Sequence, residues 1–279
     1  MQEDASPWDA VALEAEEDNS TIRTGKWRNV AYNWLAHYAE YKAQHLILQA
    51  IETQVRLKSG ARILDVGCGP GKWMNLFAER GFATTGIDSS PWMIRLAKKA
   101  TRKNARKLTF AVANIAKLES PSDFYDMVNC VTVLQHILDD ENWKSAVHEM
   151  VRVAKPFGYI LIFEAAPSFV FKRRTRHLRF RTMKEYIREF DKAGACLVYW
   201  RATDLSFPVT YLGLRKYAAS FSKKVYYFTG EMPLLSPNLL SFMTRIAVIL
   251  AKPMDYRLAE TPLSFLSVGK LLLFRKVGS

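Results

Sequence analysis

A glycine-rich turn with an acidic residue before it is the segment of this sequence best suited to chemistry. Residues 64–71 read LDVGCGPG. Glycines allow a ligand to approach the backbone closely, and free N–H groups at the start of a helix bind polar or anionic groups. The spacing is G-x-G-x-G, whereas the dinucleotide fingerprint G-x-G-x-x-G requires a glycine where Lys72 stands. We therefore expect residues 67–71, the glycine turn, to bind something other than an ordinary dinucleotide.

Two carboxylates accompany the glycine turn. Asp65 precedes it, and Asp88 ends the next apolar run, 23 residues further on. A carboxylate at Asp65 would repel a pyrophosphate but would attract a ligand that carries an ammonium and a sulfonium. A carboxylate at the end of a second strand can accept hydrogen bonds from both hydroxyls of a ribose.

Alternating strands and helices are expected to position these residues. Apolar runs predict strands at 61–67, 83–88, 108–113, 125–134, 159–164, 196–200 and 268–274. Helical patterns lie at 42–54, 74–80, from Pro91 after the capping pair Ser89–Ser90, at 142–153 before the stop at 155–158, and at 182–193. This order is typical of βαβ units, with a parallel sheet covered on both faces.

The predicted organisation is one domain with additions. Residues 1–22 are acidic and predict a flexible tail, and residues 23–279 predict a single domain that begins with cap helices at 23–58. Residues 206–263 are too long for a loop and predict a helical insertion before the last strand, with helices at Tyr211–Phe228 and Asn238–Lys252.

The chain is strongly basic, with a formal net charge of +13. Such a charge attracts nucleic acid, anionic lipid or phosphorylated substrates without choosing among them. The loop Lys172–Arg181 holds six Lys or Arg residues, which suits a substrate phosphate, diphosphate or carboxylate, or a solvated loop. The basic, apolar stretch 211–252 suits peripheral membrane contact, a lid or a dimer face, and the sequence leaves these open.

The cysteines and the N-terminal residues indicate the cellular compartment. Cys68, Cys130 and Cys196 form no CxxC pair, and the two in strand-like runs, Cys130 and Cys196, predict buried free thiols. The first residues are acidic where a signal peptide is basic and then apolar. We expect a cytoplasmic protein. The histidines lack metal-ligand spacing, so no metal is predicted.

Four segments together resemble the class I S-adenosylmethionine-dependent methyltransferases. They are LDVGCGPG (64–71), GIDSSPWM (86–93), ANIAKL (113–118) and CVTVLQHI (130–137), in the family's order. The resemblance covers about residues 62–200 and implies a Rossmann-like α/β fold. Its seven-stranded sheet would be mostly parallel, with helices on both faces and the last strand antiparallel.

The resemblance also implies how the cofactor S-adenosylmethionine would be held. Gly67, Gly69 and Gly71 would shape the pocket for the methionyl part, with Asp65 near its amino acid group and Asp88 on the ribose.

The adenine would lie near the following helix and the third motif. Ser89 adjoins the ribose residue, Met93 would pack on the adenine, and Asn114 with Ile115 would flank its edge. The family usually has Asp where this chain has Asn114, although an amide carbonyl can still accept the adenine amino group.

The fourth motif bears on the acceptor. It lacks the N/D-P-P-Y/F pattern of enzymes that methylate base amines, and it resembles the branch that methylates small molecules such as quinones, sterols and sugars. We expect in-line transfer to an oxygen, nitrogen or carbon atom of a small or lipid-linked molecule. His136 is a candidate general base or a packing residue, and Glu164 a candidate for orienting the substrate. The rivals are an RNA methyltransferase and a non-catalytic binding scaffold.

Overall fold

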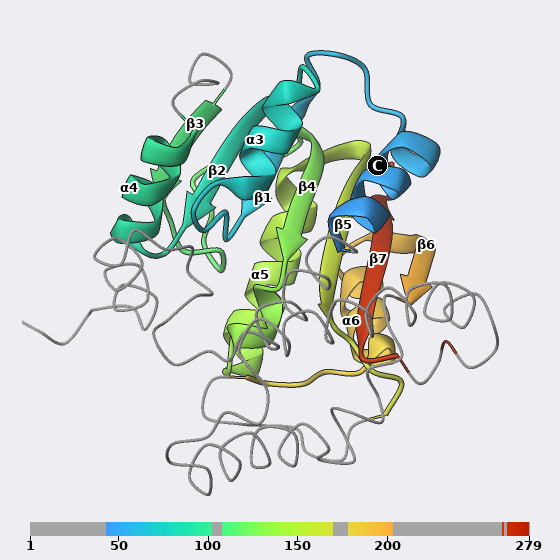
Figure 1. Ribbon diagram of the computed structural model, residues 1–279. Helices are drawn as coiled ribbons and strands as arrows, with labels where there is room; N and C mark the ends of the chain where they lie inside the picture. The colour runs from blue at the N-terminus through green and yellow to red at the C-terminus, as the bar shows by residue number, and fades with distance from the viewer. Residues whose placement is uncertain (1–42, 102–107, 170–177, 203–263, 265–266, 279) are drawn as a thin grey trace, which may run out of the picture.

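A seven-stranded sheet forms the centre of the molecule. The computed structural model describes residues 43–101, 108–169, 178–202, 264 and 267–278. The strands are β1 (Arg62–Val66), β2 (Ala83–Asp88), β3 (Leu108–Val112), β4 (Tyr125–Val131), β5 (Ala154–Ala165), β6 (Ala195–Ala202) and β7 (Gly269–Lys276). Their order is β3-β2-β1-β4-β5-β7-β6, with β7 antiparallel to both of its neighbours (Figure 1). The predicted Rossmann-like fold, with its antiparallel last strand, is confirmed.

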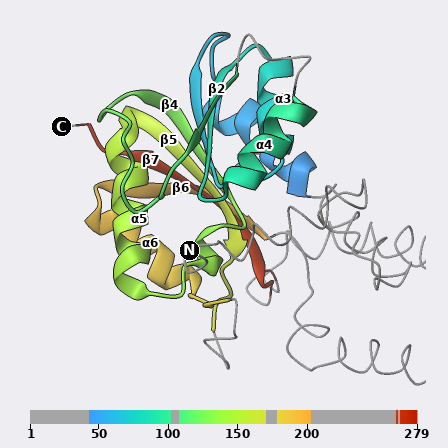
Figure 2. The ribbon, with the colours of Figure 1, turned by 90° about the vertical axis from the view of Figure 1, so that its left-hand side faces the viewer.

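Helices cover both faces of this sheet. On one face lie α3 (Lys72–Glu79), α4 (Pro91–Ala100) and a helix at 43–50 that continues as the π-helix η1 (Ile51–Val55). On the other lie α5 (Asp140–Val153) and α6 (Met183–Lys192) (Figure 2). Each face has its own apolar core, because alternate strand residues such as Ile63 and Leu64 point to opposite sides. The sheet is therefore buried on both faces, and its carboxyl edge is the place where side chains can meet a ligand.

Side-chain caps set the starts of the helices. The Ser90 hydroxyl accepts the N–H of Met93 at 3.2 Å, and the Asp139 carboxylate accepts that of Asn142 at 2.8 Å. Thr182 and Glu185 form a reciprocal capping box at α6. The predicted cap before Pro91 is confirmed, with Ser90 as the capping residue.

The junction between α5 and β5 is tighter than its sequence suggests. The helix stops at Val153 as predicted, but β5 begins at once, and Ala154 pairs with Tyr125. The pairing then resumes at Met127 and Tyr159, so the intervening Pro and Gly residues form an irregularity inside the strand instead of a loop before it.

Two of the three cysteines are buried, and one is not. Cys68 and Cys130 are buried, whereas Cys196 is exposed. The prediction of a buried thiol at Cys196 is wrong because β6 is the edge strand of the sheet, and this residue faces solvent there.

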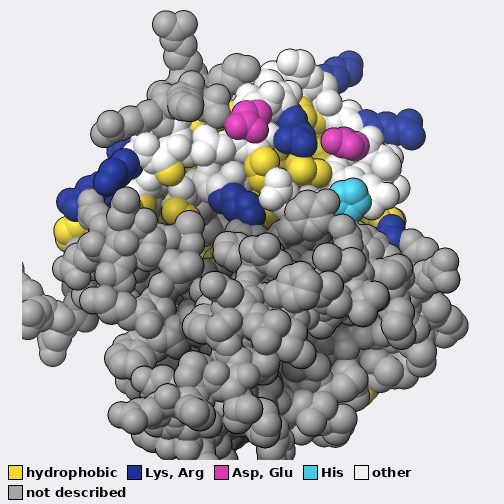
Figure 3. Space-filling view, viewed as in Figure 1, with side chains coloured by type: hydrophobic (Ala, Val, Ile, Leu, Met, Phe, Trp, Pro, Cys, Tyr) yellow, Lys and Arg dark blue, Asp and Glu magenta, His cyan; other side chains and the backbone are white. Residues whose placement is uncertain are grey.

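Several predicted segments lie outside the described residues. They are the acidic tail (1–22), the part of the cap region up to residue 42, most of the basic loop (170–177) and the insertion (206–263). No helix of the described chain is long and apolar enough to cross a membrane. Where described side chains are visible beside α3, basic, acidic and hydrophobic groups are interspersed (Figure 3).

Candidate functional site

The glycine turn joins β1 to α3 through backbone that favours glycine. Gly67, Gly69 and Gly71 have φ values of 64°, 51° and 80°. A Cβ added at Gly67 would lie 2.3 Å from a Val133 methyl carbon, and one at Gly71 would lie 2.9 Å from the Thr101 methyl carbon. A Cβ at Gly69 would meet nothing within 4 Å. Two glycines are therefore required for packing, while the middle one borders open space.

Asp88 ties the glycine turn to the end of β2. Its Oδ2 accepts the N–H of Gly69 at 3.0 Å, and its Oδ1 accepts the N–H of Ser90 at 2.9 Å. The side chain is half-buried. The structure thus brings Asp88 against the turn, as the sequence predicted, and the residue stays partly exposed.

Asp65 lies beneath the glycine turn with a partner that the sequence analysis missed. It is paired in register with Asn129 of β4, and the Asn129 amide donates to Asp65 Oδ1 at 2.7 Å. Both side chains are buried. The other two oxygens, Asp65 Oδ2 and Asn129 Oδ1, have no hydrogen-bond partner. Two buried acceptors without a donor make a site for a proton, a water or a cationic N–H group.

Burial controls the charge of Asp65. Removal from water raises the pKa of its carboxyl to about 7, against the opposing hydrogen bond from Asn129 and with a further increase from the charge of Asp88. A bound cation would lower this pKa again, so the site favours a positively charged group over an anion.

A short turn after β4 closes the other side of the site. Thr132 has a φ of 58°, and the 3₁₀-helix η3 (Leu134–His136) follows it. We call residues 133–137 the His136 turn. The carboxylate of Glu164, at the end of β5, accepts three of its N–H groups: Val133 at 2.7 Å, Leu134 at 2.8 Å and Gln135 at 3.3 Å. The carboxyl contacts backbone, although Glu164 was predicted to orient the substrate.

Arginines hold the far end of the same turn. The Arg181 guanidinium donates to the carbonyl oxygens of Leu134 and Ile137, at 3.4 and 3.1 Å, and to Asp140 Oδ1 at 2.8 Å. Arg179 also pairs with Asp140, at 2.8 Å. These two cations of the predicted basic loop therefore already have an acidic partner.

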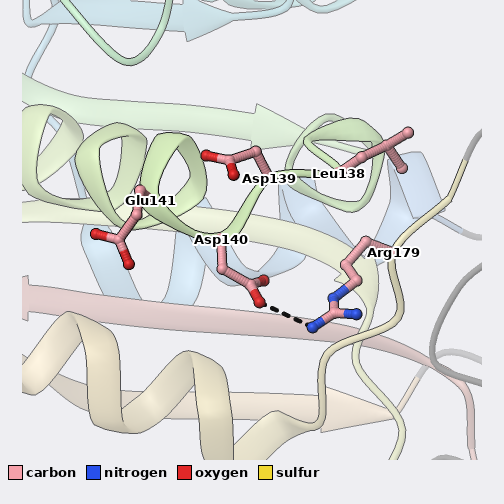
Figure 4. A pocket seen from close by; sticks show the side chains of 5 residues that line it. All are labelled: Leu138, Asp139, Asp140, Glu141 and Arg179. Carbon is pink, nitrogen blue, oxygen red and sulfur yellow. Dashed lines mark hydrogen bonds and ion pairs between the residues drawn. The ribbon is translucent and has the colours of Figure 1, made fainter.

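An open pocket of about 360 Å³ lies beside this ion pair. It is lined by Leu138, Asp139, Asp140, Glu141 and Arg179, and the Arg179 side chain reaches across it toward Asp140 (Figure 4). None of the predicted cofactor residues lines it. We place the site at the glycine turn instead, because the buried unpaired acceptors of Asp65 and Asn129, the positive-φ glycines and Asp88 lie there.

Residues 63–158 match the family model of a methyltransferase domain. The match starts in β1 and ends in β5, so it spans the glycine turn, Asp88 and the His136 turn. Over these residues the chain is similar to methyltransferase domains, and we refer to this part as the methyltransferase domain.

Curated relatives of the methyltransferase domain include ubiquinone biosynthesis O-methyltransferases. The protein of that name from Nitrosospira multiformis is 32% identical over 53% of this chain and 64% of its own length. The one from Coxiella burnetii is 29% identical over 52% of this chain and 62% of its own length. The matched part thus spans less than two thirds of these relatives.

Solved structures share the fold of the methyltransferase domain. The [4+2]-cyclase SpnF superposes with a TM-score of 0.58 at 20% identity, covering 85% of this chain and 82% of that chain. Phosphoethanolamine N-methyltransferase 2 of Haemonchus contortus, solved with S-adenosyl-L-methionine, has a TM-score of 0.56 at 16% identity, covering 97% of this chain and 57% of that chain.

The residues predicted to surround adenine lie at one end of the methyltransferase domain's sheet. The Ala113 N–H donates to the Asp88 carbonyl at 3.0 Å, which places the third motif beside the end of β2. Asn114 is exposed, and its carbonyl Oδ1 already accepts the N–H of Ala116 at 2.9 Å. Ser89 is exposed, Ile115 is half-buried and packs on the core, and Met93 is buried. Their contacts with adenine stay predictions.

The remaining predictions concern His136 as a base and the absence of a metal site. The His136 side chain is half-buried within η3, so its role as a base stays a prediction. Among the described residues, no group of three or more His, Cys, Asp or Glu side chains could hold a metal ion.

Two positioning features escaped the sequence analysis. Asn129 interrupts the apolar run YDMVNCV. Because a buried amide in a central strand needs a hydrogen-bond partner, this polar residue was the signal that could have predicted the pair. Arg181 carried no such signal, because within a run of basic residues it is indistinguishable from its neighbours.

Proposed function

We propose that this chain transfers the methyl group of S-adenosylmethionine to a small or lipid-linked acceptor. The observation that carries the proposal is the glycine turn between two carboxylates, Asp65 below it and Asp88 beside it. A ligand with an ammonium, a sulfonium and a ribose matches this arrangement in charge and in hydrogen bonding. The matched family model and the ubiquinone relatives support the same activity.

The proposed cofactor residues divide by chemistry. The ammonium end would face Asp65, over the space that Gly69 leaves open, while Gly67 and Gly71 keep the turn close to its neighbours. The ribose hydroxyls would bind Asp88 next to Ser89. Bound S-adenosylmethionine supplies a methyl group on an already activated leaving group, so alignment is the protein's main task.

Met93, Asn114 and Ile115 would border the adenine. Because the Asn114 carbonyl already accepts the N–H of Ala116, the adenine amino group would share that acceptor.

The acceptor would meet the methyl group near the His136 turn. If it is a hydroxyl, as the relatives' name O-methyltransferase favours, it must lose a proton, and His136 would accept that proton. Lipid-linked acceptors and peripheral membrane contact through 211–252 remain part of this proposal. A [4+2] cyclisation is a second candidate function. It is favoured only by the likeness to a [4+2]-cyclase, a protein in which the same fold serves a reaction other than methyl transfer.

Calorimetric titration with S-adenosylhomocysteine tests the cofactor site. The wild type should bind at roughly 1–100 µM, and Asp88→Ala should weaken binding by about 10- to 100-fold because charge-assisted hydrogen bonds are lost. Asp126→Ala is the matched control. Asp126 also accepts a backbone N–H, from Arg62 at 2.8 Å, but it does so at the opposite end of the sheet.

The protein should first be unfolded and refolded to remove any copurified ligand. Failure of the refolded wild type to bind would overturn the cofactor proposal. Binding without turnover of any small hydroxyl, amine or lipid-linked acceptor would favour the non-catalytic scaffold. Salt-sensitive turnover of RNA would favour the RNA methyltransferase instead.

A further inference from the structure

The His136 turn is held at both ends by side chains from two other segments, the carboxyl group of Glu164 and the guanidinium of Arg181. Glu164 reaches the start of the turn from β5, and its carboxylate accepts three successive N–H groups that no helix partner would satisfy. Arg181 reaches the end of the turn from the segment before α6 and donates to two of its carbonyl groups. The bonds that Arg181 donates are stronger than ordinary backbone bonds, because the guanidinium is charged.

Neither side chain is available to a substrate. Glu164 is 1% exposed and Arg181 is 2% exposed. Both Glu164 oxygens already accept N–H groups, and the Arg181 guanidinium is shared between the turn, Asp140 and the ring of Trp143, 4.4 Å from the ring centre. Their effect on any reaction must pass through the backbone that they hold.

The held backbone adjoins the glycine turn. The gap between Gly67 and Val133 is so small that a single added Cβ would overlap a Val133 methyl group. Val133 is also the first residue whose N–H binds Glu164. A displacement of the turn therefore changes the position of His136 relative to the glycine turn.

Two further bonds brace the same segment. The N–H of Ala165 donates to Gln135 Oε1 at 3.3 Å, and the N–H of Arg179 donates to the Gln135 carbonyl at 2.8 Å. Gln135 thus links the end of β5 to the segment that carries Arg181.

We propose that Glu164 and Arg181 are positioning residues of the methyl transfer, which set the distance between the His136 turn and the glycine turn. This inference rests on the proposed function, because it assigns a role within that same site. It develops the expectation that Glu164 orients the substrate, with the effect acting through the backbone of the turn.

The test compares Glu164→Gln and Arg181→Met with the control Glu149→Gln in the full chain. Glu149 likewise accepts a backbone N–H, from Leu118 at 2.6 Å, and pairs with an arginine, but it touches no residue of the turn. Three quantities are measured: hydrogen exchange of the peptide that contains residues 133–137, S-adenosylhomocysteine affinity, and kcat and KM with the acceptor that the screen identifies.

Expected results separate positioning from mere stability. In both turn variants, exchange in the 133–137 peptide should rise about 10-fold or more, and kcat should fall about 10- to 100-fold, while KM for S-adenosylmethionine changes less than about 3-fold. Glu149→Gln should alter neither exchange in this peptide nor kcat. Glu164→Asp, which keeps a carboxyl group, should recover part of the lost kcat.

Other outcomes overturn the inference. Unchanged exchange would show that the two side chains do not hold the turn, and faster exchange with normal kcat would show that holding it is irrelevant to transfer. If Glu164→Gln does not fold, Arg181→Met decides alone. A wild type that neither binds S-adenosylhomocysteine nor turns over would instead contradict the proposed function, and the exchange measurement would still report whether Glu164 and Arg181 hold the turn.

Discussion

Asn129 donates a 2.7 Å hydrogen bond to Asp65 across two central parallel strands, and each side chain keeps one buried oxygen without a partner. Burial raises the pKa of this carboxyl group to about 7, because water cannot stabilise its charged form there. The protonation state of Asp65 is therefore expected to depend on what binds above it.

Cofactor binding should release protons from Asp65. The pKa of the free protein's carboxyl is about 7, so the group is mostly protonated at about pH 6, and an adjacent ammonium would lower that pKa. Affinity for S-adenosylhomocysteine should rise with pH up to about 7 and then level off. Titrations at about pH 6 in buffers of different ionisation enthalpy should reveal the released proton, and Asp65→Asn should show none. Heats independent of the buffer would contradict this link.

Replacement of Asn129 should destabilise the protein and shift this titration. Asn129→Leu removes the donor that partly stabilises the Asp65 carboxylate, so the pKa of Asp65 should rise further and the free energy of unfolding should fall by about 1–3 kcal/mol. Urea unfolding at several pH values would measure both effects. As a control, Asn142→Ala removes an exposed amide from α5. Equal stability of Asn129→Leu and wild type would show that the pair contributes nothing.

Gly69 should matter for binding more than for folding. Gly60 is the matched position: both glycines have positive φ and open space around a Cβ, but Gly60 precedes β1, outside the site. Alanine at either position should cost about 1–2 kcal/mol of stability through backbone strain. Only Gly69→Ala should also weaken S-adenosylhomocysteine binding, by about 10-fold or more, because its methyl group fills space over the turn. Parallel losses of affinity in both variants would count against a ligand at Gly69.

Glu164 should make stability depend on pH. Burial raises the pKa of this carboxyl from 4.5 to about 8, against the N–H groups that favour its charged form. The folded state then binds more protons than the unfolded state between these values, so the free energy of unfolding should fall as pH rises from about 4.5 to 8. In Glu164→Gln the decrease in the free energy of unfolding over this pH range should be smaller, by on the order of 2–4 kcal/mol. Unfolding curves of both proteins across this range would check it, and parallel curves would contradict it.

Local patterns predicted the elements that local contacts determine. The run ATTGID alternates and ends in an acid, and β2 has the predicted bounds Ala83–Asp88. The fourth strand was expected to continue to Leu134 because its residues stay apolar, yet β4 ends at Val131. The reason is a contact that is distant in sequence: Glu164, about 30 residues away, binds the N–H groups that a longer strand would have used.

The residues of the candidate site also fall into those recognisable from local sequence and those that depend on distant contacts. The glycine turn and Asp88 could be recognised because their spacing is itself the signal, and the structure brings them within hydrogen-bonding distance. The roles of Asn129 and Arg181 depend on which strands and loops become neighbours, and no short window of residues contains that information. The sequence therefore predicted the residues of the candidate site better than the neighbours that hold them in place.

The position of β7 has a consequence for synthesis on the ribosome. Among the seven strands of the sheet β7 is made last, yet it lies between β5 and β6, whose residues emerge earlier. Until residues 269–276 leave the exit tunnel, the edges of both earlier strands lack their partner, and such edges invite wrong pairing with other chains. The nascent protein can pair β1 to β5 first, but it must keep the edge of β5 open for a strand that arrives later.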